Sequence, residues 1–205
     1  SFLIGKYEVT QSQYEEVIGP TVFCYAGDTS LPAEWVTWYE AVTFCNELSD
    51  SEGLDPCYTI NGDLTVCDWS KNGYRLPTEA EWEFAARGGT LSGGFLYSGS
   101  DTADQVAWYS ANGGSSTHPV GAKAANELGI HDMSGNVSEW CWDRRGAYSS
   151  SAQTDPTGPG SGMNRVLRGG CFFYDEDSVR CTYRDSTDPT VSINDMGFRI
   201  ARRPD

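Results

Sequence analysis

Three segments in the first half of the chain combine a helix-starting signal with an amphipathic pattern. Each begins with a threonine followed three positions later by Gln or Glu. The pairs are Thr10 and Gln13, Thr37 and Glu40, and Thr78 and Glu81. In this capping-box pattern the threonine hydroxyl accepts a hydrogen bond from a backbone amide, and the Gln or Glu side chain reaches back. Glycines follow the periodic runs at positions 19, 53 and 88, so the sequence predicts three helices with defined ends.

The rest of the pattern predicts strands and loops. Residues 57–67 surround an Asn-Gly pair and predict a β-hairpin. Cys57 and Cys67 lie at similar distances from its tip, so a disulfide and a pair of reduced, packed thiols both fit. Beyond Gly93 helical patterns are hard to find, residues 148–162 predict an exposed loop, and residues 165–169 and 197–202 predict core strands. The pattern alone indicates one α+β domain.

Composition narrows the range of functions. Lys plus Arg is 14 against 29 Asp plus Glu, a formal charge of −15, so nucleic-acid binding is excluded as a function class. An aromatic content of 13% argues against disorder. No apolar run has the length of a membrane helix, and the first residues do not form a signal peptide. The 7 cysteines include no C-x-x-C pair, so zinc is not indicated and the compartment stays open.

Six phrases along the chain carry a family resemblance. They are residues 5–14 (GKYEVTQSQY), 36–41 (VTWYEA), 74–88 (YRLPTEAEWEFAARG), 135–140 (GNVSEW), 165–170 (RVLRGG) and 197–199 (GFR). In this order they resemble the formylglycine-generating enzyme (sulfatase-modifying factor) family over nearly the whole chain. The resemblance implies an α+β, C-type-lectin-like fold, with a small twisted antiparallel sheet, a few helices and much irregular loop. It also implies a single domain over residues 1–205.

Family resemblance does not settle whether the chain is an enzyme. The oxidases of this family hold copper with two cysteines shortly after the Arg-x-Gly-Gly phrase, and soft thiolates suit Cu(I). By count these positions are Tyr174 and Val179 here, while Cys171 and Cys181 lie ten apart. We therefore expect no copper and no catalysis. The alternative is a catalytic or accessory oxidoreductase of the formylglycine-generating type that uses Cys171 or Cys181 as a thiol.

The tail, residues 171–195, is similar to the variable regions of proteins from diversity-generating retroelements, which often use this fold. In such regions adenines are randomised, frequently in AAC codons, and this cannot produce Lys, Glu, Gln, Met or Trp. Within the tail only Glu176 belongs to that excluded set, whereas the rest of the chain uses all five residue types. The resemblance therefore implies a sequence-diversified binding region.

Aromatic side chains give rigid contacts, and Ser, Thr and Asp give adaptable hydrogen bonds, so the tail composition suits binding. We expect Phe172 to point inward, and Arg168, Arg180, Arg184 and Arg199 to brace the site through carboxylates and carbonyls. The predicted ligand-binding residues, all expected to be exposed, are Phe173, Tyr174, Asp175, Asp177, Ser178, Tyr183, Asp185, Ser186, Thr187, Asp188, Thr190, Val191, Ser192, Asn194 and Asp195.

The resemblance also sets expectations about partners and location. We expect a non-catalytic binding protein with a protein or other macromolecule as its ligand, no nucleic acid, and a monomeric state. Proteins of this kind are usually exported, so we expect an extracellular or outer-surface location, with membrane contact only through a lipid anchor. A carbohydrate ligand, by analogy with lectins, is an alternative that rests on the fold alone.

A structural calcium ion is the last expectation from the family. Matched position by position, its ligands are Asp132, the carbonyls of Gly135 and Val137, and Glu139. Calcium prefers six to eight hard oxygen ligands, which water would complete. The alternative is that Glu139 bonds backbone amides of its own turn and no ion binds.

Overall fold

The computed structural model describes residues 1–204 and contains the three predicted helices. They are α1 (Gln11–Ile18), α2 (Trp38–Ser51) and α3 (Glu79–Ala86). In each helix the N-cap threonine and the Gln or Glu three positions later form both hydrogen bonds of the capping box. The three predicted stop glycines all have positive φ. The local sequence signals are therefore sufficient to place the starts and ends of these helices.

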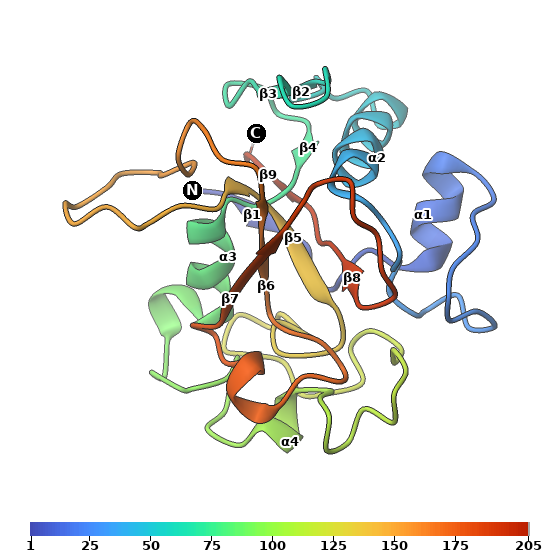
Figure 1. Cartoon of the computed structure of the whole chain (residues 1–205), viewed down its shortest axis with the longest axis vertical. Helices are drawn as coiled ribbons and strands as arrows, with labels where there is room; N and C mark the ends of the chain where they lie inside the picture. Colours follow the sequence, from blue (N-terminus) through green and yellow to red (C-terminus); the bar gives the residue numbers. More distant parts are fainter. Residues whose placement is uncertain (205) are drawn as a thin grey trace.

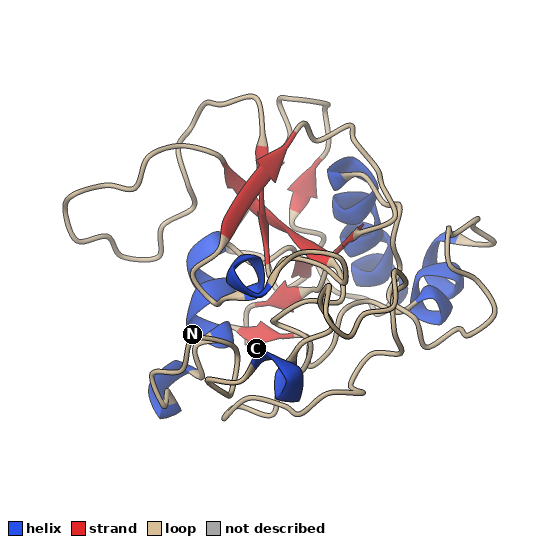
Figure 2. Cartoon of the chain, turned by 60° about the horizontal axis from the view of Figure 1, so that its bottom comes forward, coloured by secondary structure: helices blue, strands red, loops and turns tan. Residues whose placement is uncertain are grey.

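Two small sheets lie near the centre of the molecule, with the helices around them (Figures 1 and 2). The first has the order β7-β6-β5-β8, formed by Arg184–Thr187, Arg165–Arg168, Ser138–Arg144 and Met196–Gly197. The second has the order β1-β9-β4, formed by Leu3–Ile4, Ala201–Arg202 and Tyr74–Arg75. Because β1 pairs with β9, the two ends of the described chain lie side by side.

The strand predictions are partly wrong. Residues 197–202, predicted as one strand, are divided between β8 in the first sheet and β9 in the second. Between them Phe198 and Arg199 are both completely buried, so the chain crosses from one sheet to the other through the core. In addition, β8 runs parallel to β5, so the first sheet is not purely antiparallel. The strand β5 was not predicted, because most of its residues are buried on both faces and show no alternation.

The predicted hairpin is present as β2 (Tyr58–Thr59) and β3 (Val66–Cys67). Its register pairs Tyr58, not Cys57, with Cys67. All seven cysteines are free thiols, and the Cys57 thiol donates a hydrogen bond to the carbonyl of Gly73 at 3.2 Å. Of the two alternatives for this pair, the structure has the reduced one.

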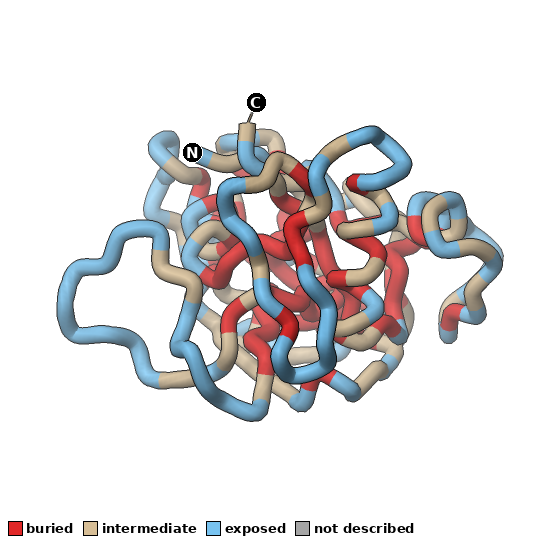
Figure 3. Tube along the Cα trace, turned by 90° about the horizontal axis from the view of Figure 1, so that it is seen from above, coloured by how far each residue is buried: buried red, intermediate tan, exposed pale blue. Residues whose placement is uncertain are grey.

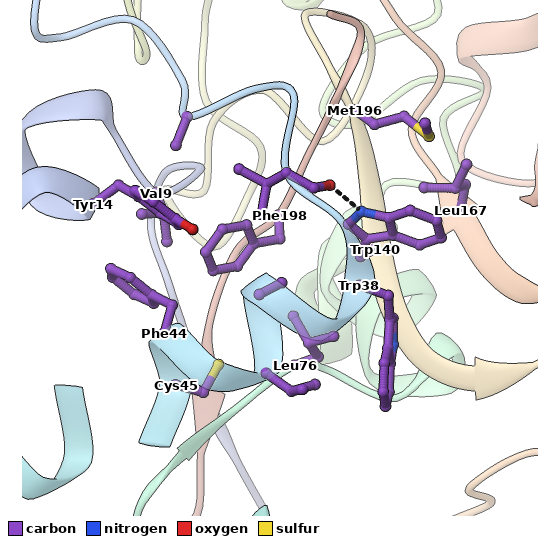
Figure 4. Packing of buried hydrophobic residues seen from close by; sticks show 14 of the residues in the cluster. Val9, Tyr14, Trp38, Phe44, Cys45, Leu76, Trp140, Leu167, Met196 and Phe198 are labelled. Atoms are coloured by element: carbon purple, nitrogen blue, oxygen red, sulfur yellow. Dashed lines mark hydrogen bonds between the residues drawn. The ribbon is translucent and has the colours of Figure 1, made fainter. Parts of the chain in front are cut away.

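A cluster of buried aromatic side chains joins α1, α2 and β5 (Figure 4). The rings of Tyr14 and Phe44 stack at 5.4 Å, and Phe198 meets Phe44 edge-on at 5.3 Å. Trp140 on β5 donates its indole N–H to the carbonyl of Val36 at 2.8 Å, the dashed line in Figure 4. A buried indole with a hydrogen-bond partner contributes packing without the cost of an unsatisfied donor. These contacts hold β5 in a fixed place under the tail.

Long irregular segments surround this core, and Figure 3 shows them as exposed loops around a buried interior. Residues 145–164 form the exposed loop that protrudes beside α3 in Figure 1, and they include the loop predicted over residues 148–162. After Gly93 the described helices are the single turns α4 (Ala103–Val106) and η2 (Glu176–Val179), while η1 (Gly89–Leu91) precedes them. Within residues 1–204, no helix combines the length and hydrophobicity that crossing a bilayer requires.

Candidate functional site

The tail consists of η2, β7 and the loop after β7, and its exposed side is called the face below. Every predicted ligand-binding residue except Asp195 reaches the surface. Five of them are exposed, namely Phe173, Asp175, Asp177, Asp188 and Thr190, and the others are half-buried. Phe172 is 2% exposed and points inward, as predicted. Residues 184–187 form β7 at the edge of the first sheet, which explains their intermediate burial.

Asp195 does not belong to the surface, and its predicted exposure is wrong. The side chain is 2% exposed, and the thiol of Cys171 donates a weak hydrogen bond to its Oδ2 at 3.5 Å. Its carbonyl accepts a hydrogen bond from the amide of Ser138 at 2.7 Å. Burial raises the pKa of this carboxyl. Asp195 therefore closes the tail against β5 and is not available to a ligand.

Backbone hydrogen bonds fix the tail to segments outside it. Besides the ladder between β7 and β6, such bonds run from Phe172 N to Asn136 O (2.9 Å), Ser110 N to Tyr174 O (2.9 Å), Cys181 N to Leu96 O (3.0 Å), Trp38 N to Pro189 O (3.1 Å), Trp35 N to Ile193 O (3.2 Å) and Ser138 N to Asp195 O (2.7 Å). Because only main-chain atoms take part, these bonds do not depend on the identity of the tail side chains.

The entry to the tail requires glycine. Gly169 and Gly170 have φ values of 88° and 68°, a region that glycine adopts without strain. A Cβ on Gly170 would lie 2.2 Å from the carbonyl oxygen of Ser178. This close approach of the backbone brings η2 directly over the end of β6.

Arg168 braces the tail from below, as predicted. Its side chain is completely buried and donates to the carbonyls of Cys181 (2.9 Å), Thr182 (3.2 Å) and Tyr183. It also pairs with the carboxylate of Glu83 on α3. One guanidinium thus satisfies three successive carbonyls before β7, where the side chains of the tail turn outward.

The two arginines inside the tail, Arg184 and Arg180, also form ion pairs with carboxylates. Arg184 forms two hydrogen bonds to the carboxylate of Glu79, at 2.5 and 2.6 Å, and donates to the carbonyl of Gly146 at 2.6 Å. Arg180 pairs with Asp177 at 2.5 Å at the surface. Both cations are therefore engaged within the protein.

Three aromatic side chains form a connected edge along the face. Phe173 meets Tyr174 edge-on at 5.2 Å, and Tyr174 meets Tyr183 at 6.0 Å. The Tyr174 hydroxyl donates to Asp185 at 3.3 Å, and burial together with this carboxylate raises the pKa of the phenol. Such rings offer large contact area with little loss of side-chain entropy on binding.

A segment outside the tail, which the sequence pattern did not indicate, borders this face. Asn194 donates to the Tyr25 hydroxyl at 2.9 Å, and the Tyr25 ring packs edge-on against Phe172 at 5.6 Å. Trp35, which is 49% exposed, adjoins Ile193 through the backbone hydrogen bond described above. A tryptophan in a loop just before a capping box was the signal that could have indicated this segment.

The cysteines do not support the catalytic alternative. Tyr174 and Val179 occupy the positions that the resemblance assigns to the copper ligands, and the side chain of Val179 is buried among apolar neighbours. The thiols of Cys171 and Cys181 are completely buried and bond to different groups, Asp195 and the carbonyl of Ala86. Burial raises the pKa of Cys171, and it raises that of Cys181 to about 11. A reactive thiol requires access and a lowered pKa, and neither cysteine has them.

The predicted calcium ligands fit an ion only in part. Asp132 accepts a hydrogen bond from the Gly121 amide on one oxygen at 2.6 Å, and its other oxygen is buried without a hydrogen-bond partner. Glu139, by contrast, accepts from Arg199 at 2.6 and 2.7 Å and from the indole of Trp82 at 2.7 Å. The alternative that Glu139 bonds amides of its own turn is therefore wrong. Within residues 1–204, no three or more His, Cys, Asp or Glu side chains group as a metal site.

Comparison with known proteins identifies relatives that match nearly the whole chain. The solved structure of Treponema denticola variable protein 1 superposes with a TM-score of 0.93 at 39% identity, covering 99% of this chain and 84% of that chain. Chaperone protein LppX of Paenibacillus barcinonensis is 39% identical over 233 residues, covering 98% of this chain and 80% of LppX.

A shorter match links the chain to enzymes. The formylglycine-generating enzyme of Streptomyces coelicolor is 38% identical over 151 residues, 65% of this chain and 48% of the enzyme. The predicted α+β fold, with few helices and much loop, is confirmed by the solved neighbours. The sulfatase-modifying factor enzyme 1-like domain matches residues 1–204, and the chain belongs to this family.

Proposed function

We propose that this chain is a non-catalytic binding protein whose tail, residues 171–195, is diversified in sequence and recognises a macromolecular ligand. The observation that carries this proposal is the way the tail is held. Its backbone is fixed by main-chain bonds and by Arg168, which bonds three tail carbonyls. Side chains on the surface can therefore change while the shape of the face is retained.

Two further observations support the proposal. The tail contains only one residue, Glu176, that randomisation of AAC codons cannot produce. The solved structure that matches 99% of this chain carries the name of a variable protein. A scaffold of constant backbone contacts with a changing set of side chains is also the arrangement that antibody-like binding surfaces use.

The test is the sequence of the same locus in sister isolates. We expect substitutions to concentrate at the exposed tail positions and to spare the bracing residues Arg168, Gly170 and Asp195. An even scatter of substitutions along the chain would contradict the proposal.

A library experiment tests the same point in the laboratory. Randomising Phe173, Asp177 and Asp188 together should leave most variants folded, as measured by protease resistance and melting temperature. Randomising Gly170 and Arg168 should abolish folding in most variants, because these positions supply the backbone geometry and the buried brace. Equal losses in the two libraries would argue against a tolerant tail.

We also propose that the domain acts as a monomer at the outer cell surface, attached through a lipid anchor that lies outside residues 1–205. Display would give the tail access to a macromolecular ligand. Protease treatment of intact cells should remove the protein, and light scattering of the purified domain should give the mass of one chain. Complete protection from the protease would contradict surface display.

A further inference from the structure

Trp35 combines backbone strain with exposure. Its φ is 60°, in the left-handed region that glycine and asparagine adopt readily and that bulky residues rarely adopt. Its side chain is 49% exposed, so burial in the core does not explain why a large aromatic residue occupies this position. Strained backbone positions often mark functional sites when the surrounding structure holds them in place.

The surroundings of Trp35 do hold it in place. The preceding residue, Glu34, is completely buried and accepts a hydrogen bond from the amide of Tyr25 at 2.9 Å. Burial raises the pKa of the Glu34 carboxyl. The amide of Trp35 itself bonds to Ile193 in the tail. Trp35 is therefore fixed between a buried carboxylate and the tail.

Tyr25 extends the same border. Its hydroxyl donates to the carbonyl of Ser115 at 3.1 Å and accepts from Asn194 at 2.9 Å. Its ring packs against Phe172, which in turn contacts Phe173 at 5.2 Å. Phe173 and Ile193 are 48% and 46% exposed. A chain of contacts thus connects Trp35 and Tyr25, outside the tail, with exposed apolar side chains of the tail.

The charge of the face is negative. The tail and the two segments that are hydrogen-bonded to it, residues 22–36 and 110–118, contain no lysine, and Arg180 and Arg184 are their only arginines. Both arginines pair with carboxylates of this chain. Exposed carboxylates remain at Asp28, Asp175, Glu176 and Asp188. A cationic partner surface is complementary to this face, and an Arg or Lys side chain binds favourably over an indole ring.

We propose that Trp35 and Tyr25 are a constant anchor of the binding face, and that the ligand is a protein presenting Arg or Lys side chains to Trp35. This inference rests on the proposed function, because the tail supplies the remainder of the contact surface. The anchor gives every version of the tail a common attachment point, while the tail decides which cationic protein is bound. Tryptophan and tyrosine are the residue types that most often carry the binding energy of an interface.

The test uses a phage-displayed library of random twelve-residue peptides, selected on the purified domain. We expect the enriched peptides to contain more Arg and Lys than the library. Their affinity should fall roughly tenfold or more in Trp35→Gly and Trp35→Asn, the effect of losing an aromatic hot spot. Phe84→Asn is the matched control, since Phe84 is also 48% exposed but lies on α3, and its affinity should change less than about twofold.

Melting temperatures separate binding from folding. Trp35→Gly and Trp35→Asn should melt at the same temperature as the parent or higher, because both residues tolerate positive φ. A clear fall in melting temperature would show that Trp35 serves the fold and would overturn the inference.

The remaining outcomes distinguish the two proposals. Affinity that is insensitive to Phe173→Ser and Asp188→Asn, or a selection that enriches no peptide, contradicts the proposed function and the inference with it. Affinity that falls with these tail changes but not with the Trp35 variants overturns the inference alone. Enrichment of acidic or neutral peptides overturns the assignment of a cationic partner.

Discussion

Arg184 in the tail and Glu79 in the first turn of α3 form a two-pronged ion pair across 105 residues of sequence. The two N–O distances are 2.5 and 2.6 Å, and the side chains are only 10% and 6% exposed. Glu79 also accepts the hydroxyl of Tyr148 at 2.8 Å. One carboxylate therefore joins the tail, α3 and the protruding loop of residues 145–164, so the position of β7 depends on the constant part of the chain.

Glu79→Ala is expected to destabilise the domain strongly. It leaves the guanidinium of Arg184 buried without its carboxylate partner, which typically costs about 3–5 kcal/mol. Urea denaturation followed by tryptophan fluorescence measures the change in the free energy of unfolding. The matched control is Arg87→Ala, which breaks the exposed Arg87–Glu83 pair and should cost less than about 1 kcal/mol. Similar losses in both variants would show that the buried pair does not hold the tail.

The helices and the family were predictable because their signals are local. A capping box needs only four residues, and each of the three in this chain forms as its sequence indicates. The family phrases are continuous segments, so they identify the fold without any knowledge of long-range contacts. Much of the tail surface was predictable for a related reason, since residues 171–195 contain only one Lys, Glu, Gln, Met or Trp, whereas the rest of the chain uses all five types.

The failures concern contacts between distant residues. Asp195 is a residue type that the exposed tail contains repeatedly, yet its side chain is buried and it bonds to Cys171 and to Ser138 of β5. Glu139 was matched to a calcium site, but its partner Arg199 lies 60 positions away. No local pattern distinguishes a carboxylate that binds a metal ion from one that binds the guanidinium of an arginine. Trp35 was missed because its importance depends on its φ value and on its contact with Ile193.

Asp143 is expected to make stability decrease as the pH rises from about 4 to 7. The carboxyl is 4% exposed, and burial raises its pKa from 3.8 to about 7. A raised pKa means that the folded state holds the proton more tightly than the unfolded state. The stabilising contribution is therefore complete below the unfolded pKa and is lost as the pH approaches 7. At about 1.4 kcal/mol per pKa unit, the difference amounts to roughly 4 kcal/mol.

The variant Asp143→Asn isolates this effect. Asparagine keeps an oxygen that can accept the hydrogen bond from the Glu79 amide, at 2.8 Å in the parent, but it carries no charge. The free energy of unfolding of the variant minus that of the parent should be more positive at pH 7 than at pH 4. Urea denaturation at both pH values measures it. A difference between parent and variant that does not change with pH would contradict the raised pKa.

Thiol labelling should distinguish Cys24 from the other cysteines. Cys24 is exposed, Cys67 is half-buried, and the other five are buried. A chromogenic disulfide reagent should therefore label one thiol rapidly in the native protein and all seven after denaturation. Cys24→Ser should remove the rapid phase without changing the melting temperature. Rapid reaction of Cys171 or Cys181 would instead support the alternative in which one of these thiols is catalytic.

Calcium is expected to raise the melting temperature by binding at Asp132, whose second carboxylate oxygen is buried without a hydrogen-bond partner. Glu8, Asp132 and Glu139 are 1%, 2% and 0% exposed, and Arg199 is the cation that acts on all three. Burial and mutual repulsion raise the pKa of Glu8, and burial raises that of Asp132. Excess negative charge in such a site is neutralised either by protons or by a metal ion.

The two means of neutralisation give different results at pH 7.5. If calcium binds, millimolar calcium raises the melting temperature and a chelator lowers it, because a ligand of the folded state stabilises it. Asp132→Asn should abolish this response, because it removes the negative charge of this carboxylate, one oxygen of which has no hydrogen-bond partner. The amide oxygen of the asparagine can still accept the hydrogen bond from the Gly121 amide. A parent protein that melts at one temperature in calcium, in chelator and in neither would show that protons neutralise the buried carboxylates and that Arg199 takes the place of the ion.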